Sequence, residues 1–391
     1  MEITVKMRNN YNGIYLNILV LLMVLLSSCK KTPDDEPWVP PPPPPTQHSY
    51  VWSAIADSAQ ASIPAFYSPS GNFYQASNVS SAWVQYWPSA HTLDVLTDAY
   101  LRSSSKAAIK AQMDKLLEGM YKMNGNTWLN FYYDDMQWMA ISSLRAYKAT
   151  GDSKFRQIYE ILWPDIKNGW SSDLGGGIWW RKDNPSKNTC SNMPAALFAA
   201  RLYQETKNPD DLEWAKKIYT WQKNTLYDGS GWLLDNITKD GVKNLQWKFT
   251  YNQGTFAGAA LELYKITSEA AYLNDAMSAV DYAINSGFLT SGGILKDEGG
   301  GDGGLFKGIL VRYMTRMILE GNLPPNKKKA YADFLLANGK SLWDKGTLKG
   351  NPTLFNSNWA GKPGPSVDFT IQLSGIMLME ALAELSAAKI I

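Results

Sequence analysis

The strongest constraint on the fold is a turn motif that recurs along the chain. The segment around Tyr147 ends one helix-forming stretch and starts the next through Ala-Tyr-Lys-Ala-Thr-Gly-Asp. The segments around Tyr203 and Tyr264 repeat this design. The three tyrosines lie roughly sixty residues apart, the length of one helical hairpin plus a long return loop. The repeat predicts a chain built from helical hairpins.

Most of the chain after residue 50 shows helical spacing of its apolar residues, while strand-like alternation is confined to short pieces such as 177–180. An all-α fold is therefore expected. We predict twelve helices, near residues 50–67, 88–103, 105–123, 134–149, 153–168, 192–206, 209–226, 251–266, 269–285, 303–320, 326–344 and 367–388.

Long loops between the hairpins decide how the hairpins assemble. Five loops rich in glycine and tryptophan each precede a helix that we expect in an inner ring, at residues 124–133, 169–192, 229–251, 287–304 and 349–368. Loops gathered at one end of a rigid scaffold are where binding residues tend to lie. This arrangement favours a closed (α/α)6 barrel, a toroid of six hairpins, over an open α-solenoid.

The N-terminus predicts export and lipid attachment. Lys6 and Arg8 precede an apolar run over 14–26, and Leu-Ser-Ser then leads to Cys29, which resembles a bacterial lipobox. We expect a signal peptide over 1–28 and lipidation of Cys29. An ordinary signal peptide or a short anchor helix is the alternative, although the apolar run is short for a membrane span.

The next residues predict a tether. Residues 29–49 contain the acidic run Asp34–Glu36 and the proline run Pro40–Pro45, which is a stiff spacer. The expected location is therefore the bacterial outer membrane, on its surface or its periplasmic side, with a single folded domain over 50–391. The formal net charge of +2 does not suggest a nucleic-acid partner, and a monomer is expected.

Scarce histidine and cysteine restrict the chemistry. The chain has two histidines and two cysteines, so a Ser-His-Asp or Cys-His site would depend on His91, and a zinc site would lack its usual ligands. Cys190 is left alone in the domain once Cys29 is lipidated, which excludes a disulfide framework there. We expect neither a metal nor a cofactor. Carboxylate chemistry is what remains.

Asp134 and Asp135 are the leading candidates for that chemistry, because they stand among four aromatic residues within 131–138 at an expected helix start. Neighbouring helical residues point about 100° apart, so two carboxyl groups can flank one bond. Their small separation fits the roughly 5–5.5 Å of a retaining glycosidase. Mutual repulsion and aromatic surroundings should raise one pKa. Ordinary helix capping is the alternative.

A resemblance to a known enzyme family extends this prediction. The segment 132–136, Tyr-Tyr-Asp-Asp-Met, resembles the signature of glycoside hydrolase family 76, the endo-α-1,6-mannanases. Further matching segments follow in the same order, at residues 175–180, 192–203, 249–255 and 303–309. The resemblance implies an (α/α)6 barrel, a retaining mechanism, Asp134 as nucleophile, Asp135 as acid/base, and α-1,6-mannan or mannooligosaccharides as substrate.

Three other functions stay open at this point. A mannan-binding lipoprotein without catalysis and a transglycosylase acting on mannose-containing glycans would both carry the same residues. Another (α/α)6 carbohydrate enzyme, such as an epimerase, is disfavoured where it needs a histidine base.

Secondary candidates come from the loops and helix starts. Tyr251, Asn252 and Gln253 offer a phenol and two amides for sugar hydroxyls, and Asn192 is expected as a sugar ligand or as a helix N-cap. One of Trp179 and Trp180 is expected to stack on a sugar while the other packs into the barrel. Further expected contacts are Trp128, Tyr133 and Asp302, whereas His91 is expected to be packed and Gly299–Gly304 to be no phosphate site.

Overall fold

Twelve α-helices lie in the part of the chain that the computed structural model describes, residues 49–391, and they match the predicted ones closely. They are α2 (Trp52–Gln60), α3 (Tyr86–Arg102), α4 (Lys106–Met123), α5 (Tyr133–Thr150), α6 (Ser153–Asn168), α7 (Met193–Thr206), α8 (Pro209–Leu226), α9 (Thr250–Thr267), α10 (Ala270–Asn285), α11 (Gly303–Glu320), α12 (Pro325–Asp344) and α13 (Phe369–Ala387). The predicted signal peptide, Cys29 and the tether up to residue 48 lie outside the described residues.

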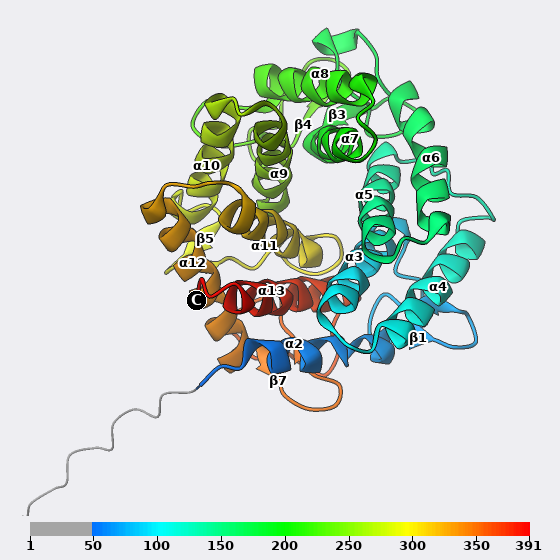
Figure 1. The fold of residues 1–391 in the computed structure, drawn as a ribbon, viewed down its shortest axis with the longest axis vertical. Coiled ribbons are helices and arrows are strands. Elements are labelled where there is room, and N and C mark those ends of the chain that lie inside the picture. The colour runs from blue at the N-terminus through cyan, green and yellow to red at the C-terminus, as the bar shows by residue number, and fades with distance from the viewer. Residues whose placement is uncertain (1–48) are drawn as a thin grey trace, which may run out of the picture. The chain divides into compact units, whose positions relative to one another are not determined.

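The helices form two concentric rings (Figure 1). In the inner ring α3, α5, α7, α9, α11 and α13 contact one another in sequence, and α13 contacts α3 to close the circle. The other six helices cover this ring from outside. The fold is therefore the expected (α/α)6 barrel and not an open solenoid.

The sixth hairpin joins the two ends of the described chain. Helix α2 packs along α13, although more than three hundred residues separate them (Figure 1). α2 is shorter than predicted, because it ends at Gln60 and a 3-10 turn over Ile63–Phe66 follows with Pro64 near its start. A proline cannot donate a backbone hydrogen bond and so interrupts a continuous helix.

Burial distinguishes the two rings. Helix α13 buries residues all around its circumference, whereas outer helix α4 buries only a stripe that includes Ile109, Met113 and Leu117. An evenly apolar helix belongs inside and an amphipathic one at the surface. Close contact within the inner ring depends on glycine, since a Cβ on Gly254 would lie 2.7 Å from the Cα of Leu310.

The repeated tyrosines share one structural role. Tyr147, Tyr203 and Tyr264 each accept, at their backbone carbonyl, a 2.8 Å hydrogen bond from the N–H of the residue four positions on. Those residues, Gly151, Lys207 and Ser268, all adopt the left-handed conformation that ends a helix. The repeat found in the sequence is therefore a repeated turn between an inner and an outer helix.

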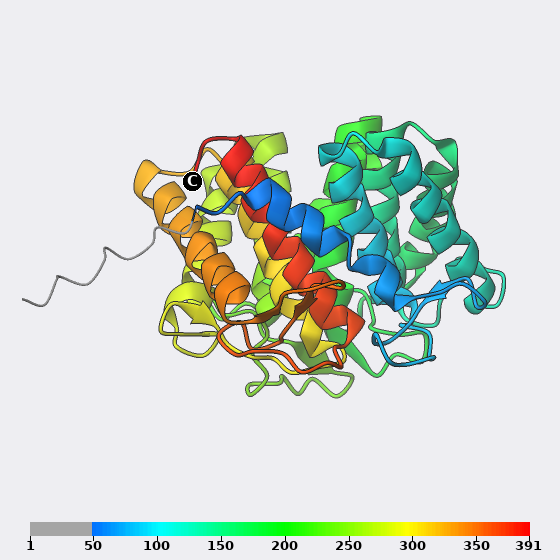
Figure 2. The same ribbon diagram turned by 90° about the horizontal axis from the view of Figure 1, so that it is seen from below.

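Long loops gather on the face where the inner helices begin (Figure 2). They contain four two-stranded antiparallel ladders: β1 (Tyr67–Ser68) with β2 (Phe73–Tyr74), β3 (Ser186–Asn188) with β4 (Asn236–Thr238), β5 (Thr290–Ser291) with β6 (Ile294–Leu295), and β7 (Thr347–Leu348) with β8 (Leu354–Phe355). The piece at 177–180 is not a strand. It makes one isolated bridge, between Ile178 and Trp170.

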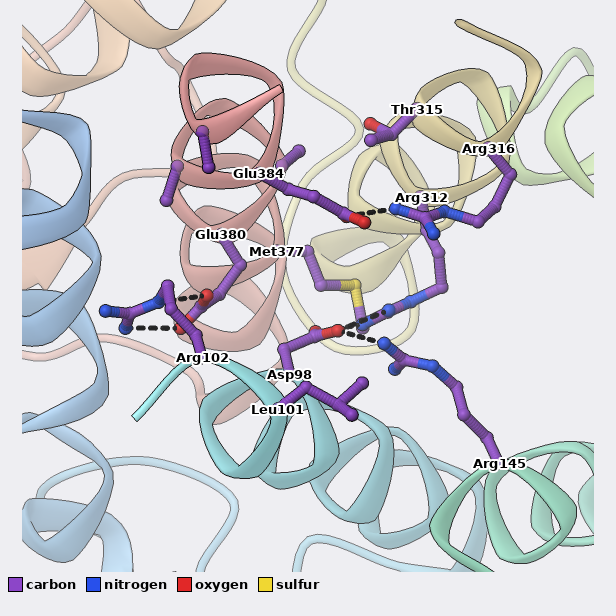
Figure 3. Close-up of a pocket in the computed structure, with 13 residues that line it drawn as sticks. Asp98, Leu101, Arg102, Arg145, Arg312, Thr315, Arg316, Met377, Glu380 and Glu384 are labelled. Atoms are coloured by element: carbon purple, nitrogen blue, oxygen red, sulfur yellow. Dashed lines mark hydrogen bonds and ion pairs between the residues drawn. The ribbon is translucent and has the colours of Figure 1, made fainter. Parts of the chain in front are cut away.

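Ion pairs fill the opposite end of the barrel (Figure 3). Asp98 of α3 pairs with Arg145 and, at 2.7 Å, with Arg312, while Arg102 binds Glu380 at 2.8 Å. A cavity of about 370 Å³ lies among them, but each carboxylate that lines it is paired with an arginine. Paired carboxylates are poor acids and bases, so this cavity is not the reaction site.

Among the helices of residues 49–391, none combines the length and the apolar character that a membrane span needs.

Candidate active site

The two aspartates lie in the first turn of α5, at the mouth of the barrel. The N-cap residue of this helix is Tyr132, so neither aspartate occupies the capping position. The backbone N–H of Tyr133 donates to the carbonyl of Trp180 at 2.9 Å, which ties the helix start to the loop over 169–192. Both carboxyl groups are partly exposed in the cleft.

The two carboxylate oxygens of Asp134 lie in different environments. Its Oδ2 accepts a hydrogen bond from the Trp180 indole at 3.2 Å, while its Oδ1 is covered by protein but has no partner. Burial raises the pKa of Asp134 to about 6, although the nearby Cys190 thiol and the Trp180 indole act in the opposite direction. This carboxyl group is therefore ionised at neutral pH.

Asp135 holds its proton more strongly. Burial raises its pKa well above the usual range, and the negative charges of Asp134 and Asp302 raise it further. Asp135 thus keeps its proton to a higher pH than Asp134 does. Such a pair supplies a nucleophile and an acid at the same bond.

Asp302 is the third carboxylate of the site. It is exposed on the loop that leads into α11, and its Oδ1 accepts a hydrogen bond from the Trp87 indole at 2.9 Å. The Trp87 ring also lies near Trp138, one turn beyond the acid pair, with centroids 6.5 Å apart. The structure thus brings Asp302, a secondary candidate in the sequence, close to Asp135.

A buried polar cluster lies near Asp134, and besides burial the charge of Asp134 raises the pKa of Tyr251. The Tyr251 hydroxyl donates to Asp235 Oδ1 at 2.7 Å, and the Asn252 amide donates to the same oxygen at 3.2 Å. Asn252 Oδ1 is covered and has no partner. Tyr251 and Asn252 were expected from the sequence, but Asp235 was missed. Its only signal is an acid set among Leu233, Leu234 and Ile237.

Two expected sugar ligands are placed differently. Asn192 is fully buried and hydrogen bonds three backbone groups, the N–H and carbonyl of Ile178 and the carbonyl of Asn188. Gln253 is also fully buried, and its amide donates to the carbonyl of Phe249 at 2.7 Å and accepts from the N–H of Leu233 at 3.1 Å. Both side chains hold loops in place, and Asn192 occupies the N-cap position of α7, one of the two roles expected for it.

Trp179 and Trp180 differ in burial. Trp179 is buried, whereas Trp180 is partly exposed, contacts Asp134 and lies 5.3 Å from the Tyr132 ring. Trp180 is therefore the ring that faces the cleft. Trp128 is partly buried against Tyr121, with centroids 5.0 Å apart.

Tyr133 packs beneath the loop over 169–192, where a Cβ on Gly169 would lie 2.9 Å from its ring. His91 packs between Trp87 and Trp138, and burial lowers its pKa to about 3. A neutral, enclosed imidazole is a packing residue, as expected from the sequence.

Lys187 is a site-supporting residue that the sequence did not single out. It is fully buried, and its ammonium group donates to the backbone carbonyls of Ser171, Asp173 and Gly176 at 3.2, 2.6 and 2.6 Å. The same group lies 4.6 Å from the Trp179 ring. This cage fixes the loop that presents Trp180 to Asp134.

Within residues 49–391, no group of three or more histidine, cysteine, aspartate or glutamate side chains could hold a metal ion.

A closed double ring of helices with two adjacent aspartates of raised pKa at its mouth is typical of (α/α)6 enzymes that act on glycosidic bonds. The family model of glycosyl hydrolase family 76 matches residues 51–389. The chain therefore belongs to this family and is a glycoside hydrolase.

Several solved structures are similar to this chain. The GH76A α-1,6-mannanase of Salegentibacter sp. HEL1_6 is 44% identical with a TM-score of 0.83, and the match covers 85% of this chain and 99% of that one. An inactive variant of that mannanase, with two consecutive aspartates changed to alanine, has been solved with α-1,6-mannotetrose. A protein of Listeria innocua is 37% identical with a TM-score of 0.79, over 86% of this chain and 98% of that one.

Among curated proteins, the mannan endo-1,6-alpha-mannosidase DCW1 of Saccharomyces cerevisiae is 36% identical over 114 residues. This match spans 25% of the present chain and 24% of the yeast protein, so it supports the family and no more.

Proposed function

We propose that this chain is a retaining endo-α-1,6-mannanase that hydrolyses the backbone of α-mannan. The observation that carries the proposal is the placement of Asp134 and Asp135 side by side in the first turn of α5, with the Trp180 indole bonded to Asp134. Burial raises the pKa of both carboxyl groups, and the charges of Asp134 and Asp302 raise that of Asp135 further. The similarity to a mannanase whose inactive variant lacks two consecutive aspartates supports the same assignment.

The mechanism follows from these two groups. The Asp134 carboxylate attacks the anomeric carbon, and Asp135 gives its proton to the leaving glycosidic oxygen, so the chain is cut and a glycosyl ester forms on Asp134. Asp135, now a carboxylate, takes a proton from water as that water attacks the anomeric carbon and displaces the Asp134 carboxylate. The second displacement restores the original anomeric configuration and both side chains. Trp180 holds Asp134 in place through its indole N–H.

An endo mode of action suits the surroundings of the acid pair. Two pairs of partly exposed aromatic rings lie near it: Trp180 with Tyr132, and Trp87 with Phe306. Aromatic faces pack against the apolar faces of sugar rings. More than one such pair suits a substrate of several sugar units, as the interior of a polymer offers.

Product analysis is the first test. Wild-type protein incubated with debranched α-1,6-mannan should release a range of oligosaccharides, initially with the α-anomer when followed by proton NMR. Asp134→Asn and Asp135→Asn should both lose activity, whereas Asp333→Asn on the outer helix α12 should keep it. Products longer than an added mannooligosaccharide would instead favour transglycosylation. Binding without any product would leave a mannan-binding protein.

Azide rescue assigns the two roles separately. With an aryl α-mannoside substrate of adequate length, Asp134→Ala and azide should yield the β-mannosyl azide, because azide replaces the missing nucleophile. Asp135→Ala and azide should yield the α-azide, because the ester on Asp134 still forms. The opposite pair of products would exchange the roles, and rescue of neither variant would argue against a covalent ester.

We also propose that lipidation of Cys29 anchors the enzyme to the bacterial outer membrane. The supporting features are the Leu-Ser-Ser-Cys sequence after an apolar run and the proline-rich segment that follows it. The full-length protein should fractionate with membranes, and Cys29→Ser should release it or stop its maturation. Protease treatment of whole cells would distinguish the outer surface from the periplasmic side. An unchanged membrane fraction for Cys29→Ser would contradict the anchor.

A further inference from the structure

The segment just before α9 exposes more apolar surface than a loop normally does. Over residues 239–249, Val242, Leu245 and Trp247 are exposed to 64%, 63% and 52%. A large exposed apolar group in a soluble domain often marks a contact site. We refer to residues 239–249 as the rim segment.

The backbone of the rim segment is held in a defined conformation. The carbonyl oxygen of the Asn244 side chain accepts hydrogen bonds from the N–H groups of Gln246 and Trp247, both at 3.0 Å. The N–H of Asn244 in turn donates to the carbonyl of Asn236, in strand β4, at 3.0 Å. A side chain that bonds two residues onward fixes a turn, so Trp247 is presented at a set place.

A row of rings connects Trp247 with the acid pair. The Trp247 ring lies 6.1 Å from Phe249, Phe249 lies 5.1 Å from Phe306, and Phe306 lies 6.4 Å from Trp87. Trp87 donates a hydrogen bond to Asp302 and lies beside Trp138 in α5. Phe249, Phe306 and Trp87 are all partly exposed. The exposed patch is thus continuous with the cleft and not a separate surface.

The chemistry of this row selects a sugar polymer. Its members offer flat apolar faces, and the carboxylate of Asp302 beside them already accepts a hydrogen bond from Trp87. Lys248, a cation of the rim segment, lies 3.6 Å from the Trp232 ring and 4.7 Å from Phe288. A pyranose has an apolar face that stacks on an indole and hydroxyls that remain in water. A glycan leaving the acid pair along this row would meet Trp247 after the rings nearest the cleaved bond.

We propose that Trp247 is a distal sugar-binding platform that stacks on a mannose unit several residues from the cleaved bond, and so gives the enzyme its preference for long chains. This inference rests on the proposed mannanase function for the identity of the sugar. It gives the rim segment a role in substrate binding that is separate from the reaction at the acid pair.

Kinetics with long and short substrates test the platform. For Trp247→Ala, KM for debranched α-1,6-mannan should rise on the order of tenfold, the change that corresponds to about 1.4 kcal/mol. KM for α-1,6-mannotriose and kcat for both substrates should stay unchanged. Trp247→Phe, which keeps a ring, should restore most of the loss. Ile161→Ala is the matched control, because Ile161 is 49% exposed on outer helix α6.

A binding measurement separates this inference from the proposed function. With both catalytic aspartates changed to asparagine, calorimetry should show weaker mannan binding when Trp247→Ala is added. If Trp247→Ala weakens mannan binding while the wild type cuts no mannan, the sugar-binding role of Trp247 is supported and the mannanase proposal is contradicted. Equal effects on mannan and mannotriose, or no effect on either, would overturn the platform. So would Trp247-dependent binding to phospholipid vesicles with mannan binding unchanged.

Discussion

The indole of Trp87 donates a hydrogen bond to the carboxylate of Asp302 across 2.9 Å, although 215 positions separate the two residues in the chain. Trp87 lies at the start of inner helix α3, and Asp302 lies directly before inner helix α11. The bond places a third negative charge near the catalytic pair, where it raises the pKa of Asp135. Closure of the helical ring thus brings the charge of Asp302 close to Asp135 and raises the pKa of that carboxyl group.

Removing that charge should make Asp135 a stronger acid. Asp302→Asn keeps a hydrogen-bond acceptor for Trp87 but removes the charge, so the pKa of Asp135 should fall and the basic limb of the kcat/KM profile should move to lower pH. Asp297→Asn is the matched control, since Asp297 lies on the same loop but does not act on Asp135. An unmoved basic limb in Asp302→Asn would show that its charge does not reach Asp135.

The wild-type pH profile should be bell-shaped. Asp134 must be ionised to attack, and its pKa is raised to about 6, so kcat/KM should fall as the pH drops through about 6. Asp135 must carry a proton, so activity should fall again when the pH rises above its own raised pKa. Initial rates on mannan from pH 4 to pH 9 test this. A profile flat through pH 6 would contradict an ionised nucleophile with this pKa.

The catalytic pair should cost the protein stability. The pKa of Asp134 is higher in the folded state than in the unfolded chain, so the folded state binds the proton more tightly and loses stability as the pH rises from about 4 to about 6. After allowance for solvent in the cleft, Asp134→Asn should raise the free energy of unfolding by about 1–2 kcal/mol at pH 7.5. Thermal unfolding should show this gain shrinking at pH 4. Asp333→Asn serves as the surface control, and a pH-independent gain would contradict the explanation.

Lys187 should be essential for the loop that carries Trp180. Lys187→Met leaves three backbone carbonyls without their donor, and for the buried one, that of Gly176, the loss costs about 1–3 kcal/mol. We expect a clear drop in Tm together with a lower kcat, because Trp180 loses its fixed position against Asp134. Lys182→Met on the same loop removes a partly exposed pair with Asp165 and a 5.9 Å contact of the ammonium group with the Tyr133 ring, and should cost about 1 kcal/mol. Equal drops for the two variants would argue against the carbonyl cage.

The ion pairs at the far end of the barrel should affect stability without affecting catalysis. Asp98→Ala leaves Arg145 and Arg312 without one of their partners and should cost about 3–5 kcal/mol. Because the network lies at the end opposite the acid pair, kcat and KM on mannan should be unchanged well below the new Tm. Asp333→Ala breaks an exposed pair with Lys329 and should cost under about 1 kcal/mol. A change in kcat for Asp98→Ala would reveal coupling between the two ends.

Local patterns in the chain account for what could be predicted. Helical spacing located all twelve helices, because that periodicity is set by which face each helix buries. The tyrosine repeat marked the turns at Tyr147, Tyr203 and Tyr264, since each turn is made by residues close together in sequence. The acid pair was found because its two members are adjacent.

Residues whose roles depend on distant partners were missed or misread. Asp235 and Lys187 look like ordinary charged loop residues until ring closure buries them against Tyr251 and the 171–176 loop. For Asn192 the sequence left a sugar ligand and a helix N-cap open, and only the structure shows that its side chain bonds the backbone of Ile178 and Asn188. A side chain's partners across a loop cannot be read from its own segment.

The sequence by itself determined the helices, the turns between them and the two carboxylates, because each of these arises from contacts within one hairpin. Only the tertiary structure decided the pairing of α2 with α13, the approach of Trp87 and Asp302, and the burial that separates the pKa of Asp134 from that of Asp135. Those features depend on closing the ring, which brings residues from distant hairpins into contact and excludes water from the cleft they line.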